Sequence, residues 1–206
     1  RFVEDSELGI SSIAVSVSGH VLVAGTTDGR TVSFPVNIDG AGQPSLGTVT
    51  QSIRLMPRPP QVREGDPIGR SARRGVLDVE VVDTAGRWVL AGTTSGRLEL
   101  IDLESATVHT VMQRDKPWTR VAVARSKQWA AASGADGHIE RFAISKTNQG
   151  PILNPIANLP GADDTQHVGA VTGLTFLEHD GPMRLVSTGD DQTIRLWDPM
   201  TGRWMF

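Results

Sequence analysis

The sequence predicts an all-β fold made of four similar antiparallel units, and three observations support this prediction. A short turn motif recurs four times along the 206 residues, at 24–29, 91–96, 132–137 and 187–192. Apolar residues alternate on both sides of each motif, as they do in strands with one buried face. In every copy a polar turn residue lies six positions before a large apolar residue, and these pairs are Asp28 and Phe34, Ser95 and Ile101, Asp136 and Phe142, and Asp191 and Trp197.

Each motif predicts a β-hairpin at the centre of a four-stranded meander. The third strands are expected at about residues 30–36, 97–102, 138–144 and 193–198, and apolar segments before and after each hairpin supply the first and fourth strands. A sheet of this kind cannot bury both faces alone, so the units are expected to stack radially as the blades of a β-propeller. The chain is one domain with blades at about residues 11–56, 76–113, 118–159 and 168–206.

Composition excludes several classes of function. The net charge of -3 provides no overall field that would attract nucleic acid or an anionic membrane. The absence of cysteine removes disulfides and thiolate metal sites, and it fits a cytoplasmic location. We expect no membrane span, since no apolar run approaches roughly 18 residues. The first residue, Arg1, is not methionine, and we expect the chain to belong to a longer polypeptide.

The fourth unit carries a family resemblance. Residues 186–198 read VSTGDDQTIRLWD and follow a histidine that lies four residues before Val171. This segment closely resembles a WD repeat, and in degenerate form the resemblance extends over nearly the whole chain. In that family a loop histidine, a strand serine or threonine, a turn aspartate and a strand tryptophan form a hydrogen-bonded network. The resemblance assigns these positions to His167, Ser187, Asp191 and Trp197.

The first three blades lack this full set. They carry Ala24, Ala91 and Ala132 where the fourth has its serine. We therefore expect those blades to rely on apolar packing.

The same residues also raise the possibility of catalysis. Serine, histidine and aspartate are the side chains of a nucleophilic triad, but the repeat register accounts for all three as a structural network. The other histidines have no second ligand at metal spacing, and no glycine-rich phosphate loop is present. We expect no catalytic residues, no metal and no cofactor.

The loops supply the candidate binding residues. The resemblance implies that the connections from each fourth strand to the next blade lie on one rim, which commonly binds partners. The connection after the first blade is basic and contains Arg58, Arg63, Arg70, Arg73 and Arg74. The connection after the third blade is acidic and contains Asp163 and Asp164. Trp118 is either a rim anchor or a core residue.

Two interpretations of the basic connection stay open. It is either a solvated insertion rich in proline and glycine, or a docking loop for an acidic protein surface or a phosphate. Nucleic acid is disfavoured, because no aromatic residue lies among the arginines to stack on bases.

The function that follows is a non-catalytic scaffold or sensor module that binds other proteins or other domains of its own chain. The alternative is a regulatory propeller domain of a larger enzyme, such as an NTPase, a protease or a kinase. The resemblance also implies more than four blades in a finished ring. The four blades are therefore expected to be part of a ring, which further blades or a second copy of the chain, in a homodimer, would complete.

Overall fold

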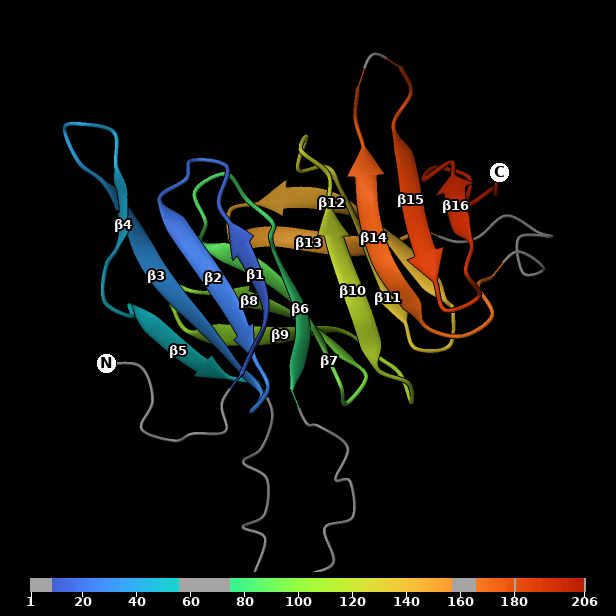
Figure 1. Ribbon diagram of the computed structural model, residues 1–206, viewed down its shortest axis with the longest axis horizontal. Coiled ribbons are helices and arrows are strands. Elements are labelled where there is room, and N and C mark those ends of the chain that lie inside the picture. Colours follow the sequence, from blue (N-terminus) through green and yellow to red (C-terminus); the bar gives the residue numbers. More distant parts are fainter. Residues whose placement is uncertain (1–8, 56–74, 157–165, 180, 206) are drawn as a thin grey trace, which may run out of the picture.

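The computed structural model describes residues 9–55, 75–156, 166–179 and 181–205, and all regular elements within them are strands (Figure 1). Blade 1 contains β1 (Ile10–Val15), β2 (Val21–Thr26), β3 (Arg30–Ile38), β4 (Pro44–Leu46) and β5 (Gln51–Arg54). Blade 2 contains β6 (Val76–Val81), β7 (Trp88–Thr93), β8 (Arg97–Asp102) and β9 (Thr107–Gln113). Blade 3 contains β10 (Trp118–Val123), β11 (Trp129–Gly134), β12 (Ile139–Thr147) and β13 (Gly150–Pro155). Blade 4 contains β14 (Val171–Leu177), β15 (Arg184–Gly189) and β16 (Ile194–Trp197).

The four central hairpins lie where the repeated motif predicts them. The third strands β3, β8, β12 and β16 confirm the register expected from the six-residue spacing. The turn before each third strand needs a left-handed backbone conformation, which glycine adopts without steric cost. Gly29, Gly96 and Gly137 supply it with φ between 80° and 85°, and Gln192 takes the same place in blade 4 with φ 61°.

Blades 1 and 4 depart from the four-stranded pattern. In blade 1 the third strand is long enough to pair with two successive strands, because β4 joins its last residues and β5 joins its first. Strand β4 was not predicted, since Asp39, Gly40, Gly42 and Pro44 are typical of a loop. In blade 4 the fourth strand is reduced to one bridge between Trp197 and Trp204.

Apolar layers join each blade to the next. The inner strands β1, β6, β10 and β14 follow one another in space, and a cluster of buried side chains fills each of the three spaces between neighbouring blades. Figure 1 shows the sheets as an arc with blade 1 and blade 4 at its two ends. The described residues thus form part of a propeller ring. They include no helix that could cross a membrane.

Candidate functional site

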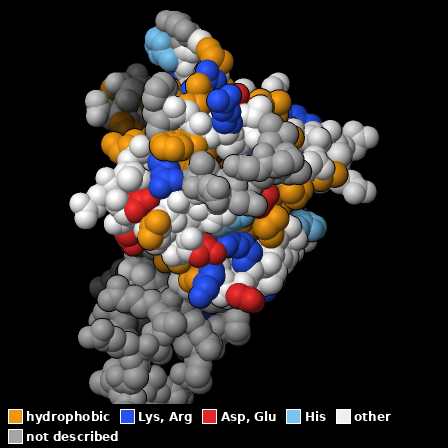
Figure 2. Space-filling model, turned by 90° about the vertical axis from the view of Figure 1, so that its right-hand side faces the viewer, with side chains coloured by type: hydrophobic (Ala, Val, Ile, Leu, Met, Phe, Trp, Pro, Cys, Tyr) orange, Lys and Arg blue, Asp and Glu red, His pale blue; other side chains and the backbone are white. Residues whose placement is uncertain are grey.

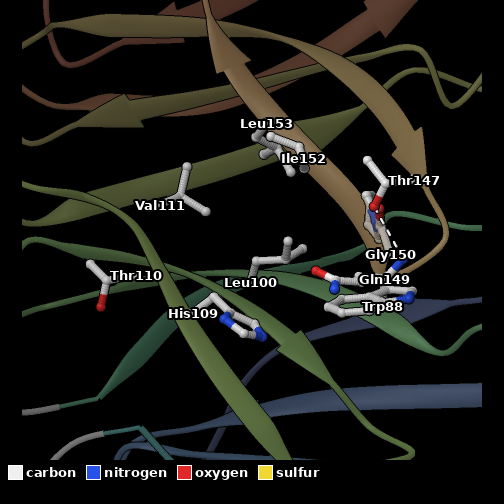
Figure 3. A pocket seen from close by; sticks show the side chains of 11 residues that line it. Trp88, Leu100, His109, Thr110, Val111, Thr147, Gln149, Gly150, Ile152 and Leu153 are labelled. Carbon is white, nitrogen blue, oxygen red and sulfur yellow. Dashed lines mark hydrogen bonds between the residues drawn. The ribbon is translucent and has the colours of Figure 1, made fainter.

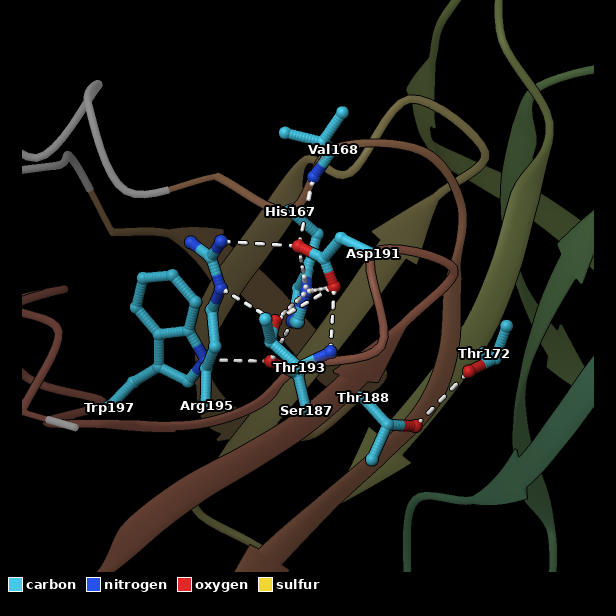
Figure 4. A network of polar contacts seen from close by, with 9 residues as sticks. All are labelled: His167, Val168, Thr172, Ser187, Thr188, Asp191, Thr193, Arg195 and Trp197. Carbon is cyan, nitrogen blue, oxygen red and sulfur yellow. Dashed lines mark hydrogen bonds and ion pairs between the residues drawn. The ribbon is translucent and has the colours of Figure 1, made fainter.

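Polar side chains of blade 4 form one connected network (Figure 4). His167 precedes β14, and its Nδ1 lies 2.9 Å from Oδ1 of Asp191 in the turn between β15 and β16. Its Nε2 lies 2.7 Å from Oγ of Ser187 on β15. Trp197 on β16 donates its Nε1 hydrogen to the same Oγ over 2.8 Å. The structure therefore brings together the four side chains that the resemblance singles out.

The partners determine the direction of each hydrogen bond. The Asp191 carboxylate can only accept, so we assign the ring hydrogen of His167 to Nδ1 and the acceptor role to Nε2. Ser187 then accepts from Trp197 and donates to His167. The side chains of His167 and Ser187 are both 0% exposed. A serine in this connectivity would be activated in a hydrolase, but here Ser187 is buried.

The turn carboxylate is strongly stabilised in its charged form. Burial alone would raise the pKa of Asp191, but hydrogen bonds from His167, from Thr193 and from the Val168 amide outweigh burial. They hold its pKa well below the usual aspartate value. Arg195 adds an ion pair at 3.1 Å. The network therefore fixes the loop before β14 against the β15–β16 turn.

Blade 3 contains a related network in which an arginine stands where blade 4 has its histidine. Arg114 lies four residues before Trp118, the first residue of β10, as His167 lies four residues before the first residue of β14. Its guanidinium forms an ion pair with Asp136 in the β11–β12 turn, and it stacks 4.7 Å from the centre of the Trp118 ring. The expected apolar packing is confirmed for Ala132 and Phe142, which are buried in the layer between blades 2 and 3. Blade 3 also has a polar contact that was not expected, because Arg114 takes the place of the histidine there.

Glycine leaves the space that the His167 and Arg114 side chains occupy. A Cβ on Gly189 would lie 2.5 Å from Nδ1 of His167, and a Cβ on Gly134 would lie 2.6 Å from Nη1 of Arg114. Both glycines stand two residues before the turn aspartate. Blades 1 and 2 have Thr26 and Thr93 at this position, and their hydroxyls bond the turn residue directly. Glycine at this position was therefore the sequence signal for an incoming histidine or arginine side chain.

A comparison with known families identifies the blade that holds the first network. Residues 155–198 match the family described as WD domain, G-beta repeat. The chain contains a WD repeat. No curated protein matches the chain. The described part of the chain is therefore a partial β-propeller with a WD repeat in its fourth blade.

Charged groups lie where blade 2 of the propeller packs on blade 3. Burial raises the pKa of Glu80 on β6 to about 7, and the adjacent Asp78 carboxylate adds to the rise. Burial also raises the pKa of Asp78, whose Oδ2 accepts the Val121 amide hydrogen over 3.0 Å. Lys127 of blade 3 donates to the Val81 carbonyl over 2.7 Å, and burial lowers its pKa. These groups join blade 2 to blade 3. Among the described residues, no cluster of three or more His, Cys, Asp or Glu could hold a metal ion.

A groove of about 350 Å³ separates the outer strands β9 and β13 (Figure 3). Its floor contains the buried side chains of Trp88, Leu100 and Leu153. Gly150 lies so close to Trp88 that a Cβ there would be 2.2 Å from the indole ring. His109 lies on one wall, with its ring centre 6.3 Å from that of Trp88. The groove is therefore apolar at its base, and its walls contain both polar and apolar side chains.

Exposed apolar side chains are concentrated at the two ends of the arc. Thirteen large apolar side chains are exposed among the described residues, and twelve of them belong to blades 1 and 4. Figure 2 views the blade 4 end and shows apolar side chains spread over this surface. Those of blade 1 are Ile10, Ile13, Val15, Val17, Ile38 and Leu46, and those of blade 4 are Val168, Leu177, Ile194, Met200, Trp204 and Met205. Ile152 of blade 3 is the remaining one.

The remaining binding candidates from the sequence are Trp118 and the charged residues of the two rim connections. Trp118 is 0% exposed and packs between blades 2 and 3, so its interpretation as a rim anchor is wrong. Its large ring fills the space between two sheets and is shielded by Arg114. The seven charged candidates of the two rim connections lie outside the described residues, and they are Arg58, Arg63, Arg70, Arg73, Arg74, Asp163 and Asp164.

Proposed function

We propose that this WD propeller is a non-catalytic, cytoplasmic scaffold that binds other proteins or other domains of its own chain and uses no cofactor. The main support for this proposal is that twelve of the thirteen exposed large apolar side chains in the described part of the chain are on the two end blades. Contiguous exposed apolar surface marks interaction sites. The inner blades bury the corresponding residues against their neighbours.

Affinity purification from the source cells tests the binding role. The wild-type chain is compared with Leu177→Asp on the blade 4 end and with Ile152→Asp as a control of similar exposure, 53% against 49%. We expect the same partner proteins, identified by mass spectrometry, with wild type and the control, and their loss with Leu177→Asp. Equal recovery with all three chains, or no partner with any of them, would count against the proposal.

Burial of the serine in blade 4 supports the non-catalytic part of the proposal. Ser187, His167 and Asp191 have the connectivity of a triad, but the serine and the histidine are closed off from solvent. We expect hydrolysis of p-nitrophenyl acetate and of a panel of peptide substrates to stay at the level of a Ser187→Ala variant. Turnover by the wild-type chain that Ser187→Ala abolishes would identify an enzyme instead.

The basic rim connection is proposed as a second contact for an acidic protein surface. Arginine supports this proposal because its guanidinium binds carboxylates in a bidentate manner. Polyglutamate is a suitable probe, and replacing all five candidate arginines by glutamine should weaken its binding at low salt. Unchanged polyglutamate binding would favour the solvated-insertion interpretation, and stronger binding of a DNA oligonucleotide would favour a nucleic-acid role.

A further inference from the structure

Equivalent positions on the four inner strands can be matched residue by residue. Each inner strand has a register irregularity immediately after its first residue, where it pairs with the second strand of its blade. The first residues are therefore equivalent, and they are Ile10, Val76, Trp118 and Val171. The second residues are equivalent as well, and they are Ser11, Leu77, Thr119 and Thr172.

A hydroxyl at the second position joins one blade to the next. Ser11 of blade 1 donates to the backbone carbonyl of Val76 in blade 2. Thr119 of blade 3 donates to the carbonyl of Val171 in blade 4 over 2.7 Å. In both cases the acceptor is the first residue of the following inner strand. We call this side-chain-to-backbone hydrogen bond the inter-blade bond.

Blade 2 has no hydroxyl at this position. Its second residue is leucine. Its third residue, Asp78, accepts the Val121 amide hydrogen, as Ser12 at the third position of β1 accepts the amide hydrogen of Val79. Each of the three internal contacts thus includes a polar side chain of one inner strand bonded to the backbone of the next.

At the two ends of the arc, blade 4 has the donor position of the inter-blade bond and blade 1 has its acceptor position. Thr172 is the donor position of blade 4, and its hydroxyl lies 3.1 Å from that of Thr188 in the same blade (Figure 4). Thr119 makes the equivalent contact within blade 3, to the Ser133 carbonyl over 3.1 Å, in addition to its inter-blade bond. Ile10 of blade 1 holds the equivalent acceptor position. In the described part of the chain, no inner strand follows β14 or precedes β1.

The sheet faces at these ends match the faces that pack together inside the arc. On blade 1, Val15 pairs with Leu22 and Leu22 with Phe34, so these side chains share the face that looks away from blade 2. On blade 4, Val186 pairs with Leu196, on the face opposite Leu185 and Trp197, which pack toward blade 3. Apolar side chains thus lie on both outer faces, together with Thr175 and Arg184 on that of blade 4. The three internal layers are also formed by apolar side chains.

We propose that a second copy of the chain covers both ends. Blade 1 of the second copy packs on blade 4 of the first, and Thr172 donates to the Ile10 carbonyl of that second copy. The reverse contact closes a two-fold ring of eight blades, which lies within the range of about four to eight blades found in propellers. A third copy would exceed that range. This inference rests on the proposed function, because it names one partner of the end blades.

Cross-linking tests the head-to-tail contact. The chain contains no cysteine, so single cysteines introduced as Ile10→Cys and Thr172→Cys are the only thiols present. When the two variants are mixed with a short bismaleimide, we expect a cross-linked dimer of twice the 22.1 kDa chain mass. Each variant alone should stay uncross-linked, because the two positions meet each other and not themselves. The intrachain pair Thr119→Cys and Val171→Cys calibrates the yield.

The mass in solution tests the ring itself. We expect a dimer of the wild-type chain by analytical ultracentrifugation, at least a tenfold weaker dimer for Leu177→Asp and Val15→Asp, and no change for Ile152→Asp. Circular dichroism checks that each variant is folded. A folded wild-type monomer at micromolar concentration, a longer open polymer, or equal weakening by Ile152→Asp would overturn the inference. Recovery of other partner proteins by a monomeric chain would leave the proposed function standing while this inference fails.

Discussion

At the scale of single residues, the serine of blade 4 shows how one hydroxyl serves two buried groups. Ser187 accepts from Trp197 and donates to His167, and all three side chains are at most 7% exposed. The alanine found at this position in the other blades needs no such partner, because Phe142 and Ile101 replace the tryptophan there and have no polar atom. The serine and the tryptophan therefore form a matched pair.

Ser187→Ala should destabilise the fold through the two groups left without a partner. The Trp197 N–H and the His167 ring nitrogen would both stay buried, and each such loss costs about 1–3 kcal/mol. Urea unfolding should give a free energy of unfolding lower by at least that amount. Ser45→Ala on the exposed β4 is the control and should change it by about 0.5 kcal/mol or less. Equal effects of the two changes would contradict the role assigned to the network.

At the scale of the blade, the hairpins and the His167 contact of blade 4 could be predicted, but the Arg114 contact of blade 3 could not. Asp28, Asp136 and Asp191 mark the turns, since a polar turn residue at a constant distance from an apolar strand residue leaves one possible register. Arg114 was not predicted, because charged loop residues are ordinarily solvated. Its contact with the turn is possible only because Gly134 has no side chain to fill that space. The short strand β4 was not predicted, because its neighbouring residues are typical of a turn. It pairs with the last residues of β3, and the length of β3 could not be predicted from the local sequence.

Arg114 should be partly replaceable by the residue that blade 4 uses. Arg114→Ala removes the ion pair with Asp136 and the stacking on Trp118, and stacking of this kind contributes about 0.5–2 kcal/mol. Arg114→His should recover part of the loss, since a histidine at this position reaches the turn aspartate in blade 4. Thermal unfolding should therefore rank wild type first, Arg114→His second and Arg114→Ala last. A histidine variant no more stable than the alanine variant would show that the two positions are not equivalent.

The inner strand of blade 2 should make stability depend on pH. Burial and the Asp78 carboxylate raise the pKa of Glu80 from 4.5 to about 7 in the folded chain. Because the raised pKa belongs to an acid, the folded state favours the protonated form, and stability falls as the pH rises from about 4.5 to 7. Lys127 lowers the pKa of Glu80 only in part.

Glu80→Gln removes this titration while keeping the size of the side chain. We expect the variant to be more stable than wild type at pH 8 and close to wild type at pH 4.5, as measured by urea unfolding at both values. The measurement at pH 4.5 is the internal control, since Glu80 is largely protonated there in the folded state. A stability difference that does not change with pH would contradict the assigned burial.

At the scale of the whole molecule, stability is expected to fall from the centre of the arc to its ends. Blades 2 and 3 pack on both faces, and all six residues of β7 are buried. Blades 1 and 4 each have a single packed neighbour in the described part of the chain. Segments with fewer buried contacts open locally at lower free energy than the core.

Hydrogen exchange measured at two protein concentrations resolves this gradient and the effect of a second copy. In dilute solution, the amides of β7 and β11 should exchange slowest, and those of β1 and β16 fastest. At a concentration where two copies associate, β1 and β14 should gain protection because each acquires a neighbouring blade, while β7 should not change. Leu177→Asp should abolish the concentration dependence, and Ile152→Asp should preserve it. Protection that rises equally in all blades would indicate general aggregation, and protection independent of concentration would mean that the end blades meet no second copy.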